Sequence, residues 1–129
     1  MNELIFFSYN SNKIKEVKKI LINTKFKILT PKDFQKTDQP KEVGITFYKN
    51  ALIKSNFGFK KFGLPCFSDD SGICINAMNN QPGIRSKRFI QENGGIKKTF
   101  ELIINETKRK KNVNAFFQTT IVLTIKTDT

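Results

Sequence analysis

The length of 129 residues fits one globular domain, and a hydrophobic content of 38% with 13 phenylalanines supplies enough bulky material for one core. The formal net charge of +12 favours polyanionic partners, while two cysteines and no histidine exclude histidine-dependent catalysis, Cys-His nucleophilic pairs and the usual zinc sites. No apolar run approaches the roughly 20 residues of a membrane-spanning helix, and the first residues lack the basic region of a signal peptide, so we expect a cytoplasmic protein whose Cys66 and Cys74 are both reduced.

The first third of the chain predicts two strands separated by a helix. Residues 4–8 form a short apolar run that ends in a polar loop, as a strand commonly does. Residues 13–22 repeat apolar side chains at helical spacing and place lysines on the opposite face. Residues 26–29 predict a second strand, and the polar residues 30–41, with a proline near each end, predict a surface loop.

The centre of the chain predicts a helix followed by two short strands. The helix is expected over residues 44–58, where apolar side chains return to one face. Residues 65–67 and 73–77 are apolar runs on either side of an acidic, glycine-containing segment, which predicts two strands joined by a turn. Residues 78–93 are expected to be irregular, because Asn, Gly and Pro interrupt them repeatedly.

The last third predicts one helix and one long strand. Residues 96–108 carry apolar side chains at helical spacing, and many of the basic residues lie around them. Residues 113–126 are rich in β-branched and aromatic side chains, which predicts a central strand. No internal repeat or low-complexity linker divides the chain, so the pattern predicts one α/β domain over residues 1–129.

The segment Ser8-Tyr9-Asn10-Ser11-Asn12-Lys13 lies where the first strand gives way to the first helix. Free N–H groups and the positive end of the helix dipole make such a junction a natural anion site, and Lys13 adds a full charge. Ser11 or Asn12 is expected to be the N-cap. The alternative is that Asn and Ser side chains only cap the helix and that Lys13 is solvated.

Asp69 and Asp70 are adjacent in Ser68-Asp69-Asp70-Ser71-Gly72. Neighbouring carboxylates repel each other and are costly to desolvate, so a nearby cation would explain the pair. Mg²⁺ takes one or two protein carboxylates together with phosphate oxygens and waters, and a carboxylate near it can deprotonate an attacking water. The alternative is an Asx-type turn with exposed acids.

Glu42 and Lys54 supply further charged groups of the kind such a site needs. Glu42 precedes the second predicted helix, where the helix dipole favours an acid in any case. Lys54 shares a face with apolar residues, and snorkelling of its stem is the alternative to a binding role. Together these parts outline a phosphoryl-transfer site: a cation neutralises a polyphosphate, lysines hold its oxygens, and a carboxylate orients or deprotonates water.

With these motifs the sequence resembles the inosine/xanthosine triphosphate pyrophosphatases, also called the Ham1-like family. The resemblance extends over essentially the whole chain and is carried by four motifs in order: Ser8-x-Asn10-x-x-Lys13-x-x-Glu16, Glu42-x-Gly44-x-Thr46-Phe47-x-x-Asn50-Ala51-x-x-Lys54, Ser68-Asp69-Asp70-Ser71-Gly72 and Pro82-Gly83-Ile84-Arg85-Ser86-Lys87-Arg88. It implies an α/β fold with a long mixed sheet flanked by helices in two lobes, and an active site in the cleft between them.

The resemblance also implies an activity and a set of roles. The expected reaction is Mg²⁺-dependent hydrolysis of deaminated purine nucleoside triphosphates (ITP, dITP, XTP) to the monophosphate and pyrophosphate, by a homodimer. Asp70 would be the general base and a Mg²⁺ ligand, and Glu42 would assist the metal. The loop from Ser8 to Lys13, Lys54 and Ser71 would contact the substrate, and Asp69 and Arg88 would support the site.

Two departures from the family pattern affect these expectations. The family usually has Tyr-Ser-Ala-Arg where this chain has Arg85-Ser86-Lys87-Arg88. This chain is also shorter and lacks the C-terminal Gly-Phe-Gly-Tyr-Asp-Pro and Ser-His-Arg motifs that hold the purine base in the family. We therefore expect poor base selectivity, and a strand at residues 113–126 that presents an edge prone to association.

Two alternative functions follow from the same residues. The chain could be a short, inactive or weakly active member of the family that folds, as a dimer for instance, without efficient turnover. It could also be a basic nucleic-acid-binding module that uses residues 97–111, although we expect nucleic acid not to be the partner. The second alternative predicts strongly salt-dependent binding to DNA or RNA that survives the substitution Asp70→Asn.

Overall fold

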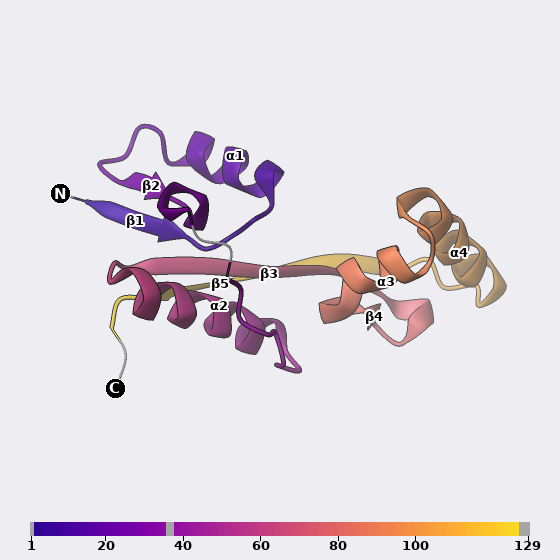
Figure 1. Ribbon diagram of the computed structural model, residues 1–129. Helices are drawn as coiled ribbons and strands as arrows, with labels where there is room; N and C mark the ends of the chain where they lie inside the picture. The colour runs from indigo at the N-terminus through magenta and orange to yellow at the C-terminus, as the bar shows by residue number, and fades with distance from the viewer. Residues whose placement is uncertain (1, 36–37, 127–129) are drawn as a thin grey trace. The chain divides into compact units, whose positions relative to one another are not determined.

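The computed structural model describes residues 2–35 and 38–126, which form helices and the strands of a mixed sheet (Figure 1). The chain divides into two compact units: Met1–Asp69 together with Thr120–Thr129, and Asp70–Thr119. Two long strands, β3 and β5, run from one unit into the other. No helix in the described part of the chain is both long and apolar enough to cross a membrane.

The strands join into one mixed sheet with the order β2-β1-β3-β4, and β5 also pairs with β3. β1 runs parallel to β2 and to β3, whereas β3 and β4 are antiparallel. This confirms the predicted α/β class with a mixed sheet. The strands are β1 (Glu3–Phe6), β2 (Lys27–Leu29), β3 (Cys66–Ile75), β4 (Gln81–Pro82) and β5 (Ala115–Thr124).

The first helix begins earlier than the sequence predicted. α1 spans Ser11–Ile20, and its N-cap is Asn10, not Ser11 or Asn12. Asn10 has extended backbone angles and its side-chain oxygen accepts hydrogen bonds from the N–H groups of Asn12 and Lys13, which is the geometry that stabilises a helix start. The expected loop at residues 30–41 contains a 3₁₀ helix, η1 (Pro31–Phe34). Its start is a capping box, in which the N–H of Thr30 donates a hydrogen bond to the carboxylate of Asp33 at 2.8 Å.

The second helix, α2 (Phe47–Phe62), covers the core of the first unit. Thr46 caps its start by accepting a hydrogen bond from the N–H of Lys49, and Gly63 ends it with a left-handed φ of 72°. The helix runs four residues beyond its predicted end, because Gly58 does not interrupt it. The core cluster beside it consists of Ile5, Phe7 and Cys66, which are almost completely buried.

Gly58 permits close packing between α2 and the sheet. A Cβ atom there would overlap the Sγ of Cys66 and lie 3.0 Å from the ring of Phe7. We predict that Gly58→Ala lowers the free energy of unfolding by about 1–3 kcal/mol, because overpacking outweighs the roughly 1 kcal/mol gain in helix propensity. Denaturant unfolding checks this, with Lys60→Ala as an exposed control in the same helix; an unchanged or higher stability would contradict it.

The acidic segment lies inside a strand and does not form a turn, contrary to the prediction. β3 is continuous from Cys66 to Ile75 and replaces the two short strands that the sequence suggested. Successive side chains of a strand point to opposite faces of the sheet. Asp69 and Asp70 therefore lie on opposite faces of the sheet, unlike two carboxylates gathered at one turn.

The second unit contains more regular structure than predicted for residues 78–93. Ser86 holds part of it together: its hydroxyl donates to the carbonyl of Gly83 at 2.6 Å and accepts from the N–H of Ile73 at 3.0 Å. The helix predicted at residues 96–108 is confirmed as α4. The helical elements of this unit are η2 (Asn76–Met78), η3 (Gly83–Arg85), α3 (Ser86–Glu92) and α4 (Ile96–Arg109).

The long strand predicted at residues 113–126 is present as β5, but its predicted central position is wrong. Among the described residues β5 pairs only with β3. The C-terminal end of β5 is attached to α2 by a small polar cluster. The hydroxyls of Ser55 and Thr124 lie 2.8 Å apart, and the hydroxyl of Thr124 also donates to the side-chain oxygen of Asn56 at 2.8 Å.

Both cysteines are buried free thiols, as predicted. Burial raises the pKa of the Cys66 thiol to about 12, against a smaller opposing effect of a backbone hydrogen bond from Phe7. Since the thiolate is the reactive form, we predict that Cys66 does not react measurably with iodoacetamide at neutral pH in the folded protein. We predict the same for Cys74 because its side chain is buried. Both should react after unfolding; rapid labelling of the folded protein, followed by mass spectrometry, would contradict the prediction.

Candidate phosphate-binding and catalytic site

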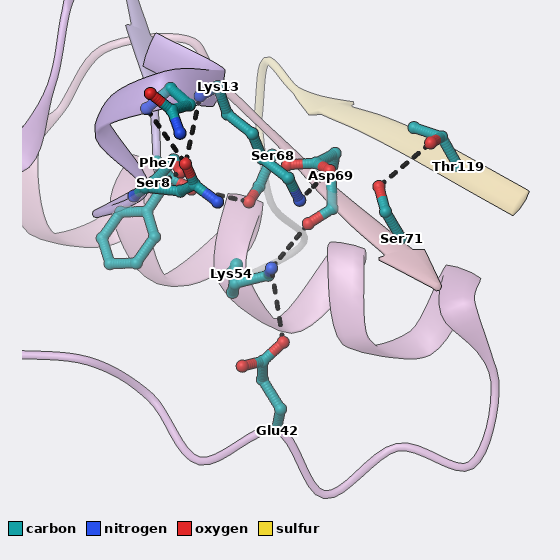
Figure 2. A network of polar contacts seen from close by, with 11 residues as sticks. Phe7, Ser8, Lys13, Glu42, Lys54, Ser68, Asp69, Ser71 and Thr119 are labelled. Carbon is teal, nitrogen blue, oxygen red and sulfur yellow. Dashed lines mark hydrogen bonds and ion pairs between the residues drawn. The ribbon is translucent and has the colours of Figure 1, made fainter. Parts of the chain in front are cut away.

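Two lysines from different helices converge on one residue of β3. The Nζ of Lys13, from α1, lies 2.6 Å from the carboxylate Oδ2 of Asp69. The Nζ of Lys54, from α2, donates to the backbone carbonyl of Asp69 at 2.5 Å. Figure 2 shows both ammonium groups reaching Asp69 from two directions. One strand residue thus fixes the positions of two cations.

Glu42 extends this arrangement from the loop before α2. Its Oε1 lies 3.3 Å from the Nζ of Lys54, and its side chain is 43% exposed. We refer to Lys13, Glu42, Lys54 and Asp69 as the Asp69 network (Figure 2). All four residues belong to the first unit.

Ser68 holds the strand at the point where the lysines meet it. Its side chain is completely buried, and its hydroxyl donates to the carbonyl of Phe7 at 2.7 Å. The N–H of Phe7 in turn donates to the carbonyl of Phe67 at 2.9 Å. These bonds connect β3 to the chain leaving β1, and so to the start of α1. Neither the Ser68 contact nor the role of Phe7 was predicted, although Ser68 belongs to the acidic motif.

Charge within the Asp69 network is balanced, because two ammonium groups face two carboxylates. The carboxylate of Asp69 is 11% exposed and that of Glu42 is 43% exposed, so Asp69 depends more strongly on its lysine for stabilisation. A polyphosphate bound here would compete with Asp69 and Glu42 for the lysines. Electrostatic attraction of a polyphosphate therefore requires positive charge in addition to that of the Asp69 network.

Several backbone N–H groups at the loop before α1 donate hydrogen bonds to side chains of the same loop. The N–H of Asn10 donates to the Ser8 hydroxyl at 3.1 Å, and those of Asn12 and Lys13 donate to the Asn10 side chain at 3.0 and 3.1 Å. The phenol of Tyr9 donates to the carbonyl of Asp38, and burial, followed by the charge of Asp38, raises the pKa of Tyr9. A phosphate at this loop would thus be held chiefly by the Lys13 side chain.

The remaining predicted site residues lie in the second unit. Asp70 follows Asp69 in β3, and its Oδ2 is buried from solvent. The hydroxyl of Ser71 lies 3.0 Å from that of Thr119 across the pairing of β3 and β5 (Figure 2). Arg88 is an exposed residue of α3. The predicted roles of these three residues stay predictions.

The described residues contain no cluster of three or more His, Cys, Asp or Glu side chains that could enclose a metal ion. Mg²⁺ is commonly bound through one or two carboxylates while phosphates and waters complete its shell. Glu42 is such a ligand candidate, because its side chain is partly open to solvent and its position is set by Lys54.

Comparison with known sequences decides the family. The sequence profile of the Ham1 family matches residues 4–129. The chain belongs to the Ham1 family. It is 39% identical over 119 residues to a dITP/XTP pyrophosphatase of Leptospira interrogans, covering 89% of this chain and 58% of the relative. It is 43% identical over 123 residues to a dITP/XTP pyrophosphatase of Borrelia duttonii, covering 91% of this chain and 60% of the relative.

Solved Ham1 structures share the fold. A HAM1 protein from Coxiella burnetii superposes with a TM-score of 0.83 at 31% identity, over 95% of this chain and 63% of that protein. The Ham1 protein of Staphylococcus aureus gives a TM-score of 0.83 at 27% identity, over 97% and 64% of the two chains. The predicted family and fold are confirmed, and this Ham1 chain spans about three fifths of the length of the relatives named above.

Proposed function

We propose that this Ham1 chain hydrolyses deaminated purine nucleoside triphosphates, such as dITP, ITP and XTP, to the monophosphate and pyrophosphate. The observation that carries the proposal is the convergence of Lys13 and Lys54 on Asp69. Two ammonium groups held from separate helices can bind oxygens of one polyphosphate. The names of the Leptospira and Borrelia relatives, both dITP/XTP pyrophosphatases, support the substrate class.

We further propose that the nucleotide binds as its Mg²⁺ complex. The carboxylates of the Asp69 network already neutralise its lysines, so the network alone has little net charge with which to attract a free triphosphate. Glu42 and Asp70 would be the protein ligands. When bound, Mg²⁺ would neutralise phosphate charge and polarise the phosphoryl oxygens.

The chain's own residues divide the remaining work. Lys13 and Lys54 would hold phosphate oxygens, with Asp69 and Ser68 fixing where the two lysines meet the strand. Asp70 would accept a proton from the attacking water, whose oxygen would form a bond to the α-phosphorus. The bond between that phosphorus and the α–β bridging oxygen would break, and pyrophosphate would leave with the bridging oxygen. The residues of the Ser8–Lys13 loop and Ser71 would contact the substrate, and Arg88 would support the site.

The direct test is pyrophosphate release by the 129-residue chain. We expect release from ITP, dITP and XTP in the presence of Mg²⁺ and none in EDTA, with ATP as the comparison that measures base selectivity. Absence of metal-dependent release from all of these nucleotides would contradict the proposal. We also propose that the chain forms a homodimer and is located in the cytoplasm. Analytical ultracentrifugation of the same sample tests the first, and fractionation of cells tests the second.

A further inference from the structure

Asn50 is a buried polar residue inside α2 to which the proposed reaction assigns no role. Its side chain is 4% exposed, and it lies one turn before Lys54 on the same face of the helix. Asparagine is a poor helix former, and burying an amide is costly unless its polar atoms are hydrogen-bonded. A residue of this kind in a helix interior needs a specific hydrogen-bond partner.

The partner of Asn50 is the loop that carries Glu42. The Oδ1 of Asn50 accepts a hydrogen bond from the backbone N–H of Gly44 at 2.8 Å. A Cβ atom on Gly44 would lie 2.7 Å from that same oxygen and 2.6 Å from the Cβ of Lys49. The backbone of the loop therefore approaches α2 too closely to carry a side chain at this position.

Capping of α2 does not account for this hydrogen bond. Thr46 caps the helix by accepting from the N–H of Lys49 at 3.1 Å, and the carbonyl of Thr46 accepts from the N–H of Asn50 at 3.2 Å. Gly44 lies before the cap, so its N–H is not one of the unpaired donors of a helix start. The bond between Asn50 and Gly44 fixes the loop and not the helix.

The loop on either side of this bond is not buried. Val43 and Ile45 are 76% and 86% exposed, so hydrophobic packing contributes little to holding it. Glu42 contacts α2 through its ion pair with Lys54 at 3.3 Å (Figure 2), and partly exposed ion pairs contribute little stability. Among the described contacts of the loop, the hydrogen bond to Asn50 is therefore the one that best fixes its position.

We infer that Asn50 is a positioning residue for Glu42. The N–H that Asn50 holds belongs to Gly44, close to Glu42 in the chain, so the bond limits where the Glu42 carboxylate can lie relative to Lys54. Removing a group that orients a metal ligand commonly lowers metal affinity by about 10–100-fold. Asn50 thus sets the affinity for Mg²⁺ through Glu42. This inference rests on the proposed function, in which Glu42 is a metal ligand.

The first test uses the 129-residue chain without metal or nucleotide. Asn50→Leu removes the acceptor and keeps a side chain of similar size. We expect the amides of residues 43–45 to exchange hydrogen about tenfold faster in this variant, and those of residues 52–60 in α2 to be unaffected. Ser55→Ala is the matched control, because it also removes a buried hydrogen bond of α2, to Thr124. Unchanged exchange of residues 43–45 in Asn50→Leu would overturn the inference.

The second test measures the Mg²⁺ dependence of pyrophosphate release. In Asn50→Leu we expect the Mg²⁺ concentration for half-maximal release to rise by about 10–100-fold, with little change in kcat at saturating Mg²⁺. Ser55→Ala should leave both quantities unchanged, because a loss of stability alone does not alter the metal dependence. Gly44→Ala should reproduce the effect of Asn50→Leu, because its added Cβ would force the loop away from Asn50.

A double variant tests whether Asn50 acts through Glu42. In the background of Glu42→Gln, Asn50→Leu should raise the Mg²⁺ requirement little further, whereas independent effects would add and would overturn the inference. Thermal melting establishes which variants are folded, and Gly44→Ala serves for both tests if Asn50→Leu is not. Pyrophosphate release whose metal dependence ignores both variants overturns the inference alone. A wild-type chain that releases no pyrophosphate overturns the proposed function and the metal role of Asn50 together.

Discussion

Asp70→Asn is expected to reduce Mg²⁺-dependent pyrophosphate release by about 10²–10⁴-fold, the range typical for removal of a general base. The substitution keeps the shape of the side chain but removes its proton-accepting oxygen and its negative charge. If Asp70 also binds Mg²⁺, the metal concentration needed for half-maximal activity rises as well. Steady-state kinetics over a range of Mg²⁺ concentrations measures both effects.

The matched control for this variant is Asp38→Asn, because Asp38 is an exposed carboxylate paired with Lys61 at 2.6 Å on the surface. Its substitution should leave kcat and the metal dependence unchanged. Glu42→Gln separates the two roles of Asp70: as a metal ligand alone, Glu42 should affect the metal dependence more than the rate at saturating metal. Full activity of Asp70→Asn at saturating Mg²⁺ would rule out the proposed base.

The fold could be predicted in outline because its strongest signals are local. Helical spacing in residues 96–108 and the β-branched run at residues 113–126 both correspond to real elements. The prediction of a turn at the acidic motif was wrong. It rested on the local preference of Asp, Ser and Gly for turns, which does not take strand pairing into account. In the structure, pairing of β3 with β1, β4 and β5 outweighs that local preference.

The charged residues of the site could be selected from the sequence, but their mutual contacts could not. Lys13 and Asp69 are 56 positions apart, and the hydrogen bond between Ser68 and Phe7 joins β3 to the segment between β1 and α1. The sequence predicts that Asn10 contacts the substrate, and the structure shows in addition that its side chain caps α1. A cap and a phosphate ligand use the same residue types, so composition alone cannot separate them.

Lys13→Met is expected to raise KM for the nucleotide by about 10–100-fold, with a smaller effect on kcat. The basis is loss of a charge-assisted hydrogen bond to phosphate, which contributes about 1.5–3 kcal/mol. The same change leaves the carboxylate of Asp69, which is 11% exposed, without this ammonium partner. We therefore also expect the free energy of unfolding to fall by about 1–3 kcal/mol, less than for a fully buried pair because the Lys13 side chain is 34% exposed.

The double variant Lys13→Met/Asp69→Asn separates these two effects. Removing the carboxylate should restore most of the lost stability, because no buried charge is then left uncompensated. It should not restore nucleotide affinity, because the ammonium group that would bind phosphate is still absent. Lys15→Met, an exposed position on the same helix, controls for the change in net charge. If the double variant regained the original KM, Lys13 would be a structural partner of Asp69 and not a phosphate ligand.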